Sequence, residues 1–161
     1  MERLWSPWRM TYITGESRKP ECVFCAAASE PEADLVVAQR ACCYVILNLY
    51  PYNNGHLMVV PRRHFASLTE ATDAELTEVM TAVRDAEAVL RQVYQPQGIN
   101  IGVNLGTAAG AGIAEHLHVH LVPRWGGDSN FMSVIGETRV LPETLAQTAA
   151  RLKPVFDRLR G

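Results

Sequence analysis

The chain of 161 residues lacks several features that would place it in a specialised class of protein. It contains no apolar run long enough to span a membrane, no low-complexity tract and no internal repeat. It also lacks a basic excess, since 15 Lys and Arg stand against 17 Asp and Glu, for a formal net charge of −2. Proteins that coat nucleic acids are usually strongly basic. We therefore expect no nucleic-acid polymer and no membrane as partner, although local cations such as Arg62, Arg63 and Arg124 can still meet a small phosphate ligand.

Cysteine is scarce too, with four residues in the chain. The first ten residues contain no apolar segment typical of an export signal, so we expect a cytoplasmic protein whose thiols stay reduced. A structural disulfide is then disfavoured, and the pair Cys22-x-x-Cys25 favours metal binding over a redox role or an incidental spacing. Cys42 and Cys43 are interpreted as packing residues of a strand.

What is present is ordinary for one globular domain of this length, with 48% hydrophobic and 20% charged residues. Period-two patterns and β-branched residues predict five strands, and turn residues between the second and third predict a hairpin. These strands are expected at residues 35–38, 42–49, 56–60, 98–105 and 116–122.

Helical spacing predicts one long helix and a helical tail. The long helix begins with the capping box Thr72-x-x-Glu75 and ends before Pro96. The tail helix is expected to start at Pro142, and Pro154 is expected to kink or split it. Antiparallel strands interrupted by a single long helix predict an α+β fold rather than an alternating α/β fold.

Three of the five histidines, His116, His118 and His120, alternate within an apolar stretch. On a strand, residues two apart project from the same face, so the three rings are expected to act together. Three interpretations stay open: polar residues on a solvated face, a catalytic metal site, or phosphorus chemistry in which a neutral imidazole is the nucleophile. An imidazole is suited to the last role because its ordinary pKa of about 6.5 leaves a neutral fraction at physiological pH.

The segment from His116 to Pro123 reads His-Leu-His-Val-His-Leu-Val-Pro, which resembles the signature of the histidine-triad superfamily. A second block agrees, because Asn48 precedes His56 by eight residues and the run Asn-Gly-His-Leu-Met-Val-Val-Pro ends at Pro61. Asn104-x-Gly106 resembles the phosphate-side loop of that superfamily. The resemblance implies the histidine-triad fold, with an antiparallel sheet of about five strands.

The resemblance also implies roles for single residues. His118 would be the nucleophile that carries a nucleoside monophosphate, His120 would contact phosphate oxygens, and His56 would support the site from the hairpin. The substrate-binding residues implied are Asn48 for the ribose, Asn104 for the phosphates, and Gly106, Thr107, Gly112 and His120 around them. Other branches carry amide or hydroxyl side chains that assist the leaving group where this chain has Ala111-Gly112-Ile113, which leaves Thr107 as the candidate substitute.

Zinc-containing members of the superfamily suggest how the Cys-x-x-Cys pair is completed. By that resemblance His64 and His116 would join Cys22 and Cys25 as ligands of one zinc ion. Four protein ligands leave no open position for a substrate, so the zinc would be structural. No organic cofactor is expected.

The segments Leu4 to Arg9, Trp125 to Phe131 and Glu137 to Arg139 resemble bacterial histidine-triad proteins described as diadenosine tetraphosphate phosphorylases. We therefore expect a single domain over residues 1–161, with an N-terminal segment 1–30 and a C-terminal extension 124–161. The expected reaction converts diadenosine tetraphosphate and orthophosphate to ADP and ATP, in a homodimer or a higher oligomer. The alternatives are hydrolysis of dinucleoside polyphosphates or nucleoside phosphoramidates, or a nucleotide-binding regulator or metal-binding module with little turnover.

Overall fold

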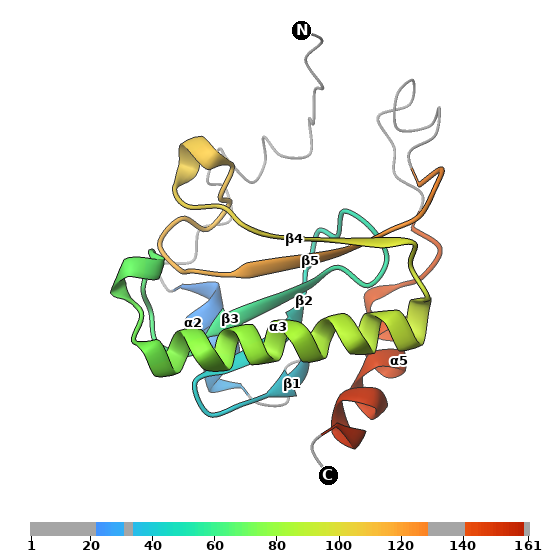
Figure 1. Cartoon of the computed structure of the whole chain (residues 1–161), viewed down its shortest axis with the longest axis horizontal. Helices are drawn as coiled ribbons and strands as arrows, with labels where there is room; N and C mark the ends of the chain where they lie inside the picture. Colours follow the sequence, from blue (N-terminus) through green and yellow to red (C-terminus); the bar gives the residue numbers. More distant parts are fainter. Residues whose placement is uncertain (1–21, 31–33, 129–140, 160–161) are drawn as a thin grey trace, which may run out of the picture.

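The computed structural model describes residues 22–30, 34–128 and 141–159. Its centre is one antiparallel sheet with the strand order β1-β2-β3-β5-β4 (Figure 1). The strands are β1 (Val36–Gln39), β2 (Cys43–Leu47), β3 (Leu57–Pro61), β4 (Gly98–Val103) and β5 (Val119–Arg124). The predicted α+β class, the five strands and the β2–β3 hairpin are confirmed.

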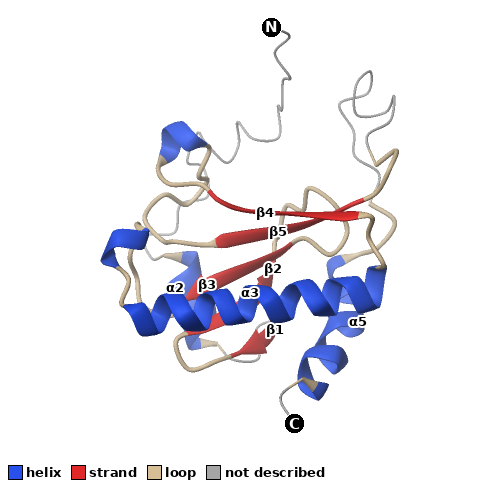
Figure 2. Ribbon diagram, viewed as in Figure 1, coloured by secondary structure: helices blue, strands red, loops and turns tan. Residues whose placement is uncertain are grey.

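Helices cover the two faces of the sheet unequally, as Figure 2 shows. The long helix α3 (Asp73–Tyr94) and the tail helix α5 (Leu145–Arg158) pack on one face, while the short helix α2 (Val23–Ser29) lies on the other. Successive side chains along each strand point to opposite faces of the sheet. Val45, Leu57 and Leu121 enter the core beneath α3 and α5. Tyr44, Met58 and Val60 point to the opposite face, where Phe24 of α2 covers them.

The long helix forms where local chemistry predicts it. The Thr72 side chain accepts a hydrogen bond from the backbone N–H of Glu75, and the Glu75 carboxylate accepts one from the Thr72 N–H, so the predicted capping box is confirmed. The helix ends at Tyr94, and the next residue, Gln95, adopts a left-handed conformation directly before Pro96. The structure also contains two 3-10 turns that were not predicted from the sequence. These are η1 (Leu68–Glu70), which precedes α3, and η2 (Thr107–Ala109), which follows β4.

The tail helix differs from the prediction at two points. It begins at Leu145 rather than at Pro142, because a second capping box between Thr144 and Gln147 satisfies the first-turn N–H groups there. It also runs unbroken through Pro154. Leu152 and Phe156, on either side of the proline, are both buried in the core, and their packing holds the helix together despite the lost backbone hydrogen bond.

Among the described residues, no helix is both long enough and apolar enough to cross a membrane. The motif Cys22-x-x-Cys25 lies at the start of α2, with Cys22 as the residue before the helix and Cys25 inside it. The resembling segments Leu4 to Arg9 and Glu137 to Arg139, and the end of the segment from Trp125 to Phe131, lie outside the described residues.

Candidate functional site

The three alternating histidines do not share one regular strand. Strand β5 begins at Val119, so His116 and His118 precede it and only His120 belongs to its ladder. The backbone N–H of Leu117 donates to the carbonyl of Phe65 at 2.7 Å, outside the sheet. The prediction of a single strand over residues 116–122 is therefore wrong at its start, and this allows the three rings to have different neighbours.

His118 is 5% exposed and held in one tautomer. Its Nδ1 lies 2.8 Å from the carbonyl oxygen of His116, and because a carbonyl can only accept, Nδ1 carries the hydrogen. In the neutral ring Nε2 is then unprotonated and bears the lone pair. Burial lowers the pKa of His118, although the bond to the His116 carbonyl works in the opposite direction. A buried neutral imidazole with one defined lone pair is equipped to attack an electrophile.

A second chain of hydrogen bonds fixes the other two rings of the site. The backbone N–H of Tyr52 donates to Nδ1 of His56 at 3.1 Å, so the hydrogen of neutral His56 sits on Nε2. That Nε2 lies 3.0 Å from Nδ1 of His120, which must accept, so neutral His120 carries its hydrogen on Nε2. The side-chain nitrogen of Asn48 lies 3.4 Å from His56 Nε2, and the Asn48 oxygen accepts from the Tyr50 N–H at 2.9 Å. Because both facing nitrogens are donors in this tautomer, Asn48 is a neighbour of His56 and not its hydrogen-bond partner.

The predicted substrate-binding residues are only partly brought together. A pocket of about 310 Å³ adjoins His120 and contains Asn104. Its described lining residues are Tyr52, Asn100, Ile101, Gly102, Asn104, His120, Val122 and Arg124. Asn48, Gly106, Thr107 and Gly112 are not part of that lining, and Thr107 is exposed in η2. The rings of His118 and His120 are adjacent, with centroids 4.8 Å apart.

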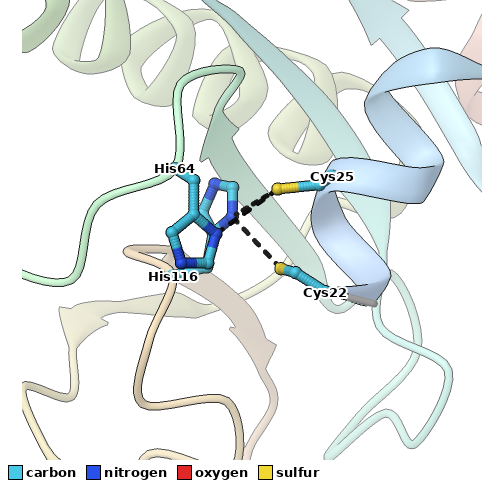
Figure 3. A group of neighbouring side chains, drawn as sticks. All are labelled: Cys22, Cys25, His64 and His116. Atoms are coloured by element: carbon cyan, nitrogen blue, oxygen red, sulfur yellow. Dashed lines mark hydrogen bonds between the residues drawn. The ribbon is translucent and has the colours of Figure 1, made fainter. Parts of the chain in front are cut away.

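A separate cluster joins two thiols and two imidazoles from distant parts of the chain (Figure 3). One ligand atom from each of Cys22, Cys25, His64 and His116 lies within 4.8 Å of the other three. The Cys22 sulfur is 3.4 Å and the Cys25 sulfur 3.6 Å from Nδ1 of His116, and the Cys25 sulfur is 3.3 Å from Nδ1 of His64. Within the described ranges, this is the one group of three or more His, Cys, Asp or Glu side chains with that proximity.

This donor set fits a tetrahedral metal ion. Zinc bonds of about 2.3 Å to sulfur and about 2.0 Å to nitrogen separate two tetrahedral ligand atoms by about 3.5 Å, close to the observed spacings. His116 is also in the correct tautomer, because its Nε2 lies 2.8 Å from the carbonyl of Pro61 and must donate to it. Nδ1 of the neutral ring is then available to a metal, and burial favours the neutral ring by lowering the pKa of His116.

Sequence reasoning missed a hydrogen-bonded group, here called the clasp, in which Asn53 of the β2–β3 turn meets Arg124 and Asp128 at the end of β5. The Asn53 side chain donates to the Asp128 carboxylate at 2.8 Å and to the carbonyl of Pro123 at 3.0 Å. Arg124 makes two bonds to Asp128, at 2.6 and 2.9 Å, and one to Asn100 at 2.9 Å. The clasp steadies the turn that carries Tyr52. Asn53 is 70 positions from Pro123 and 75 from Asp128, so no local sequence pattern predicts these two contacts.

All three cations considered for phosphate binding already have partners within the chain, and Arg124 binds Asp128 and Asn100 as described above. Arg62 donates to the backbone carbonyls of Arg40 and Ala28 and to the side chain of Gln39. Arg63 binds the Glu75 carboxylate through two hydrogen bonds of 2.8 Å. Arg124 alone of the three lines the pocket beside His120.

The fold and the site define an α+β protein whose interior strand β5 carries His120, with His116 and His118 directly before that strand. The HIT domain model matches residues 30–127, which is more than half of the chain. The chain belongs to the HIT family, as the resemblance predicted.

Individual proteins of known name are also similar to this chain. The chain is 46% identical over 157 residues to a protein of Mycobacterium tuberculosis named AP-4-A phosphorylase, covering 92% of this chain and 80% of that protein. It is 38% identical over 78 residues to the asymmetrical bis(5'-nucleosyl)-tetraphosphatase of Schizosaccharomyces pombe, covering 48% of this chain and 42% of that protein. Among solved structures, a Zn-bound histidine triad family protein from Mycobacterium smegmatis superposes with a TM-score of 0.71 at 26% identity, covering 88% and 96% of the two chains.

Proposed function

We propose that this protein cleaves diadenosine tetraphosphate with orthophosphate, giving ADP and ATP. The observation that carries the proposal is the tautomer of His118, whose Nδ1 hydrogen is bound by the His116 carbonyl so that Nε2 presents its lone pair. The named activity of the mycobacterial relative, 46% identical over most of the chain, supports this substrate. The reaction proceeds in two transfers through one covalent intermediate.

In the first transfer, Nε2 of His118 attacks the phosphorus next to one adenosine. The bond from that phosphorus to the bridging oxygen breaks, so ATP leaves and AMP stays on the ring. In the second transfer, an oxygen of orthophosphate attacks the same phosphorus, the P–N bond breaks, and ADP leaves with His118 restored to its neutral form. Both steps depend on placing the reacting atoms and stabilising charge on the phosphoryl oxygens.

The neighbouring groups suit that task. The Nε2–H of His120, fixed through His56 and the Tyr52 N–H, is a donor for a phosphoryl oxygen. Asn104 lines the same pocket and is proposed to bind phosphates, while Asn48 beside His56 is proposed to bind the ribose. Gly106 and Gly112 are proposed to supply backbone N–H groups, and Thr107 to assist the leaving group after movement of its exposed loop.

The test separates phosphorolysis from hydrolysis by the products. Purified protein is incubated with diadenosine tetraphosphate, with and without orthophosphate, and the nucleotides are resolved by chromatography. We expect ADP and ATP in equal amounts, with turnover that requires phosphate. AMP and ATP formed irrespective of phosphate would contradict the proposal and favour the hydrolase alternative, for which the fission yeast relative is named. Absence of both reactions would favour a nucleotide-binding regulator.

We further propose that Cys22, Cys25, His64 and His116 hold a structural zinc ion. The donor types, their spacing and the second hydrogen bond of His116 support this site, as does the Zn-bound HIT structure from Mycobacterium smegmatis. We expect about one zinc per chain by elemental analysis. Cys25→Ser should lose it, whereas Cys42→Ser, a matched change outside the cluster, should retain it. Loss of zinc in His118→Ala would instead indicate that the metal lies at the reacting histidine.

A homodimer is proposed through the edge strand β4. Its sequence Gly-Ile-Asn-Ile-Gly-Val carries no charge, its outer edge pairs with no other described strand, and Ile101 is 44% exposed. Uncharged edge strands are ready templates for pairing with another chain. Sedimentation should show twice the chain mass, and Ile101→Lys should shift it toward one chain mass. A monomeric parent protein would contradict the proposal.

A further inference from the structure

The two cysteines of the metal cluster lie on either side of an aromatic residue that packs on His118. Phe24 stands between Cys22 and Cys25 and is 4% exposed. Its ring centroid lies 5.0 Å from that of His118, at an angle of 48° between the planes, and 5.5 Å from that of His116. The metal cluster and the proposed nucleophile are therefore in contact through one side chain.

The helix that carries Phe24 depends on tertiary contacts for its position. Helix α2 has only seven residues, no side-chain N-cap, and Phe24 as its single buried residue. A helix of this length is not stable by propensity alone. The Tyr44 hydroxyl donates to the Phe24 carbonyl at 2.7 Å, and Arg62 donates to the Ala28 carbonyl at 3.1 Å. Bonds from both cysteines to a metal would add attachments on either side of Phe24 and so help to fix its position.

A hydrogen bond forms a second connection between the metal site and His118. The carbonyl that fixes the His118 tautomer belongs to His116, whose side chain is one of the four cluster residues. The His116 ring is anchored on its far side by the Pro61 carbonyl. The His118 imidazole therefore donates a hydrogen bond to the carbonyl of one metal-cluster residue, His116, and contacts the ring of Phe24, which stands between two others.

From this geometry we infer that Phe24 is a positioning residue for His118, and that occupation of the Cys22, Cys25, His64 and His116 site by zinc controls the orientation of the His118 ring. The inference rests on the proposed function for the roles of His118 and zinc. It adds that the metal site, although it has no open position for substrate, acts on the chemistry through Phe24. A zinc-free protein would fold around the same sheet but hold His118 loosely.

The test reads the His118 ring directly. Long-range proton–nitrogen NMR spectra of the nitrogen-15-labelled full chain distinguish the two neutral tautomers of each histidine. The parent protein is recorded with zinc and after zinc removal by a chelator, together with Phe24→Ala and the matched control Val23→Ala. Val23 is the neighbour of Phe24 between the same cysteines, but it is 50% exposed.

We expect the zinc-loaded parent and Val23→Ala to show His118 with its hydrogen on Nδ1 alone. The chelated parent and zinc-loaded Phe24→Ala should show a mixture of both tautomers, and zinc removal should change Phe24→Ala less than it changes the parent. In turnover, Phe24→Ala should lose about tenfold or more in kcat with little change in KM, because a misplacement of about 1 Å can cost about 100-fold. Phe24→Leu, which keeps an apolar side chain, should recover part of the loss.

Zinc-loaded Phe24→Ala with the parent tautomer and the parent kcat would overturn the inference. So would a chelated parent whose His118 signal does not change. If Phe24→Ala does not fold, Phe24→Leu and the chelated parent give the same comparison. Failure of the proposed function is separable: if the parent cleaves no diadenosine tetraphosphate but its His118 tautomer responds to zinc and to Phe24, the coupling stands and the reaction is wrong.

Discussion

Gly55 lies immediately before His56, in the turn that supports the histidine row, and its replacement by alanine tests how tightly that turn is built. Its φ angle is +73°, a conformation that costs a residue with a side chain about 1 kcal/mol or more. A Cβ there would also lie 3.0 and 3.1 Å from two ring atoms of Tyr94 and 3.2 Å from a Leu90 methyl group. Both neighbours belong to the packed helix α3, so relief requires movement in the core.

Overpacking of this kind costs about 1–3 kcal/mol. Adding the backbone strain, we expect Gly55→Ala to lower the free energy of unfolding by about 3 kcal/mol, which for a chain of this length lowers Tm by about 9 °C. The matched control is Gly127→Ala. Gly127 has a φ angle of +82° but no atom within 4 Å of an added Cβ, so this variant reports the backbone strain alone, about 1 kcal/mol.

Urea denaturation and thermal unfolding of the two variants measure the difference. Gly55→Ala should also lower turnover, because displacement of the turn disturbs the Tyr52 N–H bond that fixes His56 and, through it, His120. Equal losses of stability in the two variants would refute the steric argument. Full activity in a destabilised Gly55→Ala would show that the turn does not determine the His120 tautomer.

Three further predictions concern single side chains. His118→Ala should lose all measurable turnover and keep its fold by circular dichroism; residual activity near the parent level would refute the nucleophile. His120→Ala should lose about 100- to 1000-fold in kcat, the cost of one oxyanion donor, with zinc content as the control for an intact cluster. The hydrogen bonds from Arg63 hold the pKa of Glu75 at about 2, against its ordinary 4.5. The ionised Glu75 carboxylate therefore contributes stability above pH 4.5 that is lost as pH falls toward 2. Arg63→Ala should move the midpoint pH of acid unfolding to a higher value, and an unchanged midpoint would contradict that linkage.

The parts of the fold that follow from local chemistry were predictable from the sequence. The capping box of Thr72 and Glu75 depends on residues three apart, and the β2–β3 hairpin on a cluster of turn residues. Helix α2 was missed because it has only seven residues and no side-chain N-cap, and it forms where Phe24 packs against Tyr44 and Met58 of the sheet. Tertiary packing likewise carries α5 through Pro154 against its local preference.

The candidate site, like the fold, was predictable from the sequence only in part. The alternation of the three histidines was visible, but their separate roles depend on partners far along the chain. The Pro61 carbonyl that orients His116 is 55 residues away, and the His56 ring that orients His120 is 64 residues away. Such pairings are set by strand order and register, which no short pattern contains. The family resemblance predicted which four residues form the metal cluster. The tautomers of the histidines and the contact of Phe24 with His118 became visible only in the structure.

The central claim, that His118 is the covalent nucleophile, is tested most directly by trapping the intermediate. The protein is mixed with diadenosine tetraphosphate in the absence of orthophosphate, quenched in denaturant at neutral or alkaline pH, and digested for mass spectrometry. The account predicts a peptide heavier by one adenylate with the group on His118, which disappears when orthophosphate is added before the quench. An adenylate on His120, or active turnover with no adduct on any histidine, would contradict it.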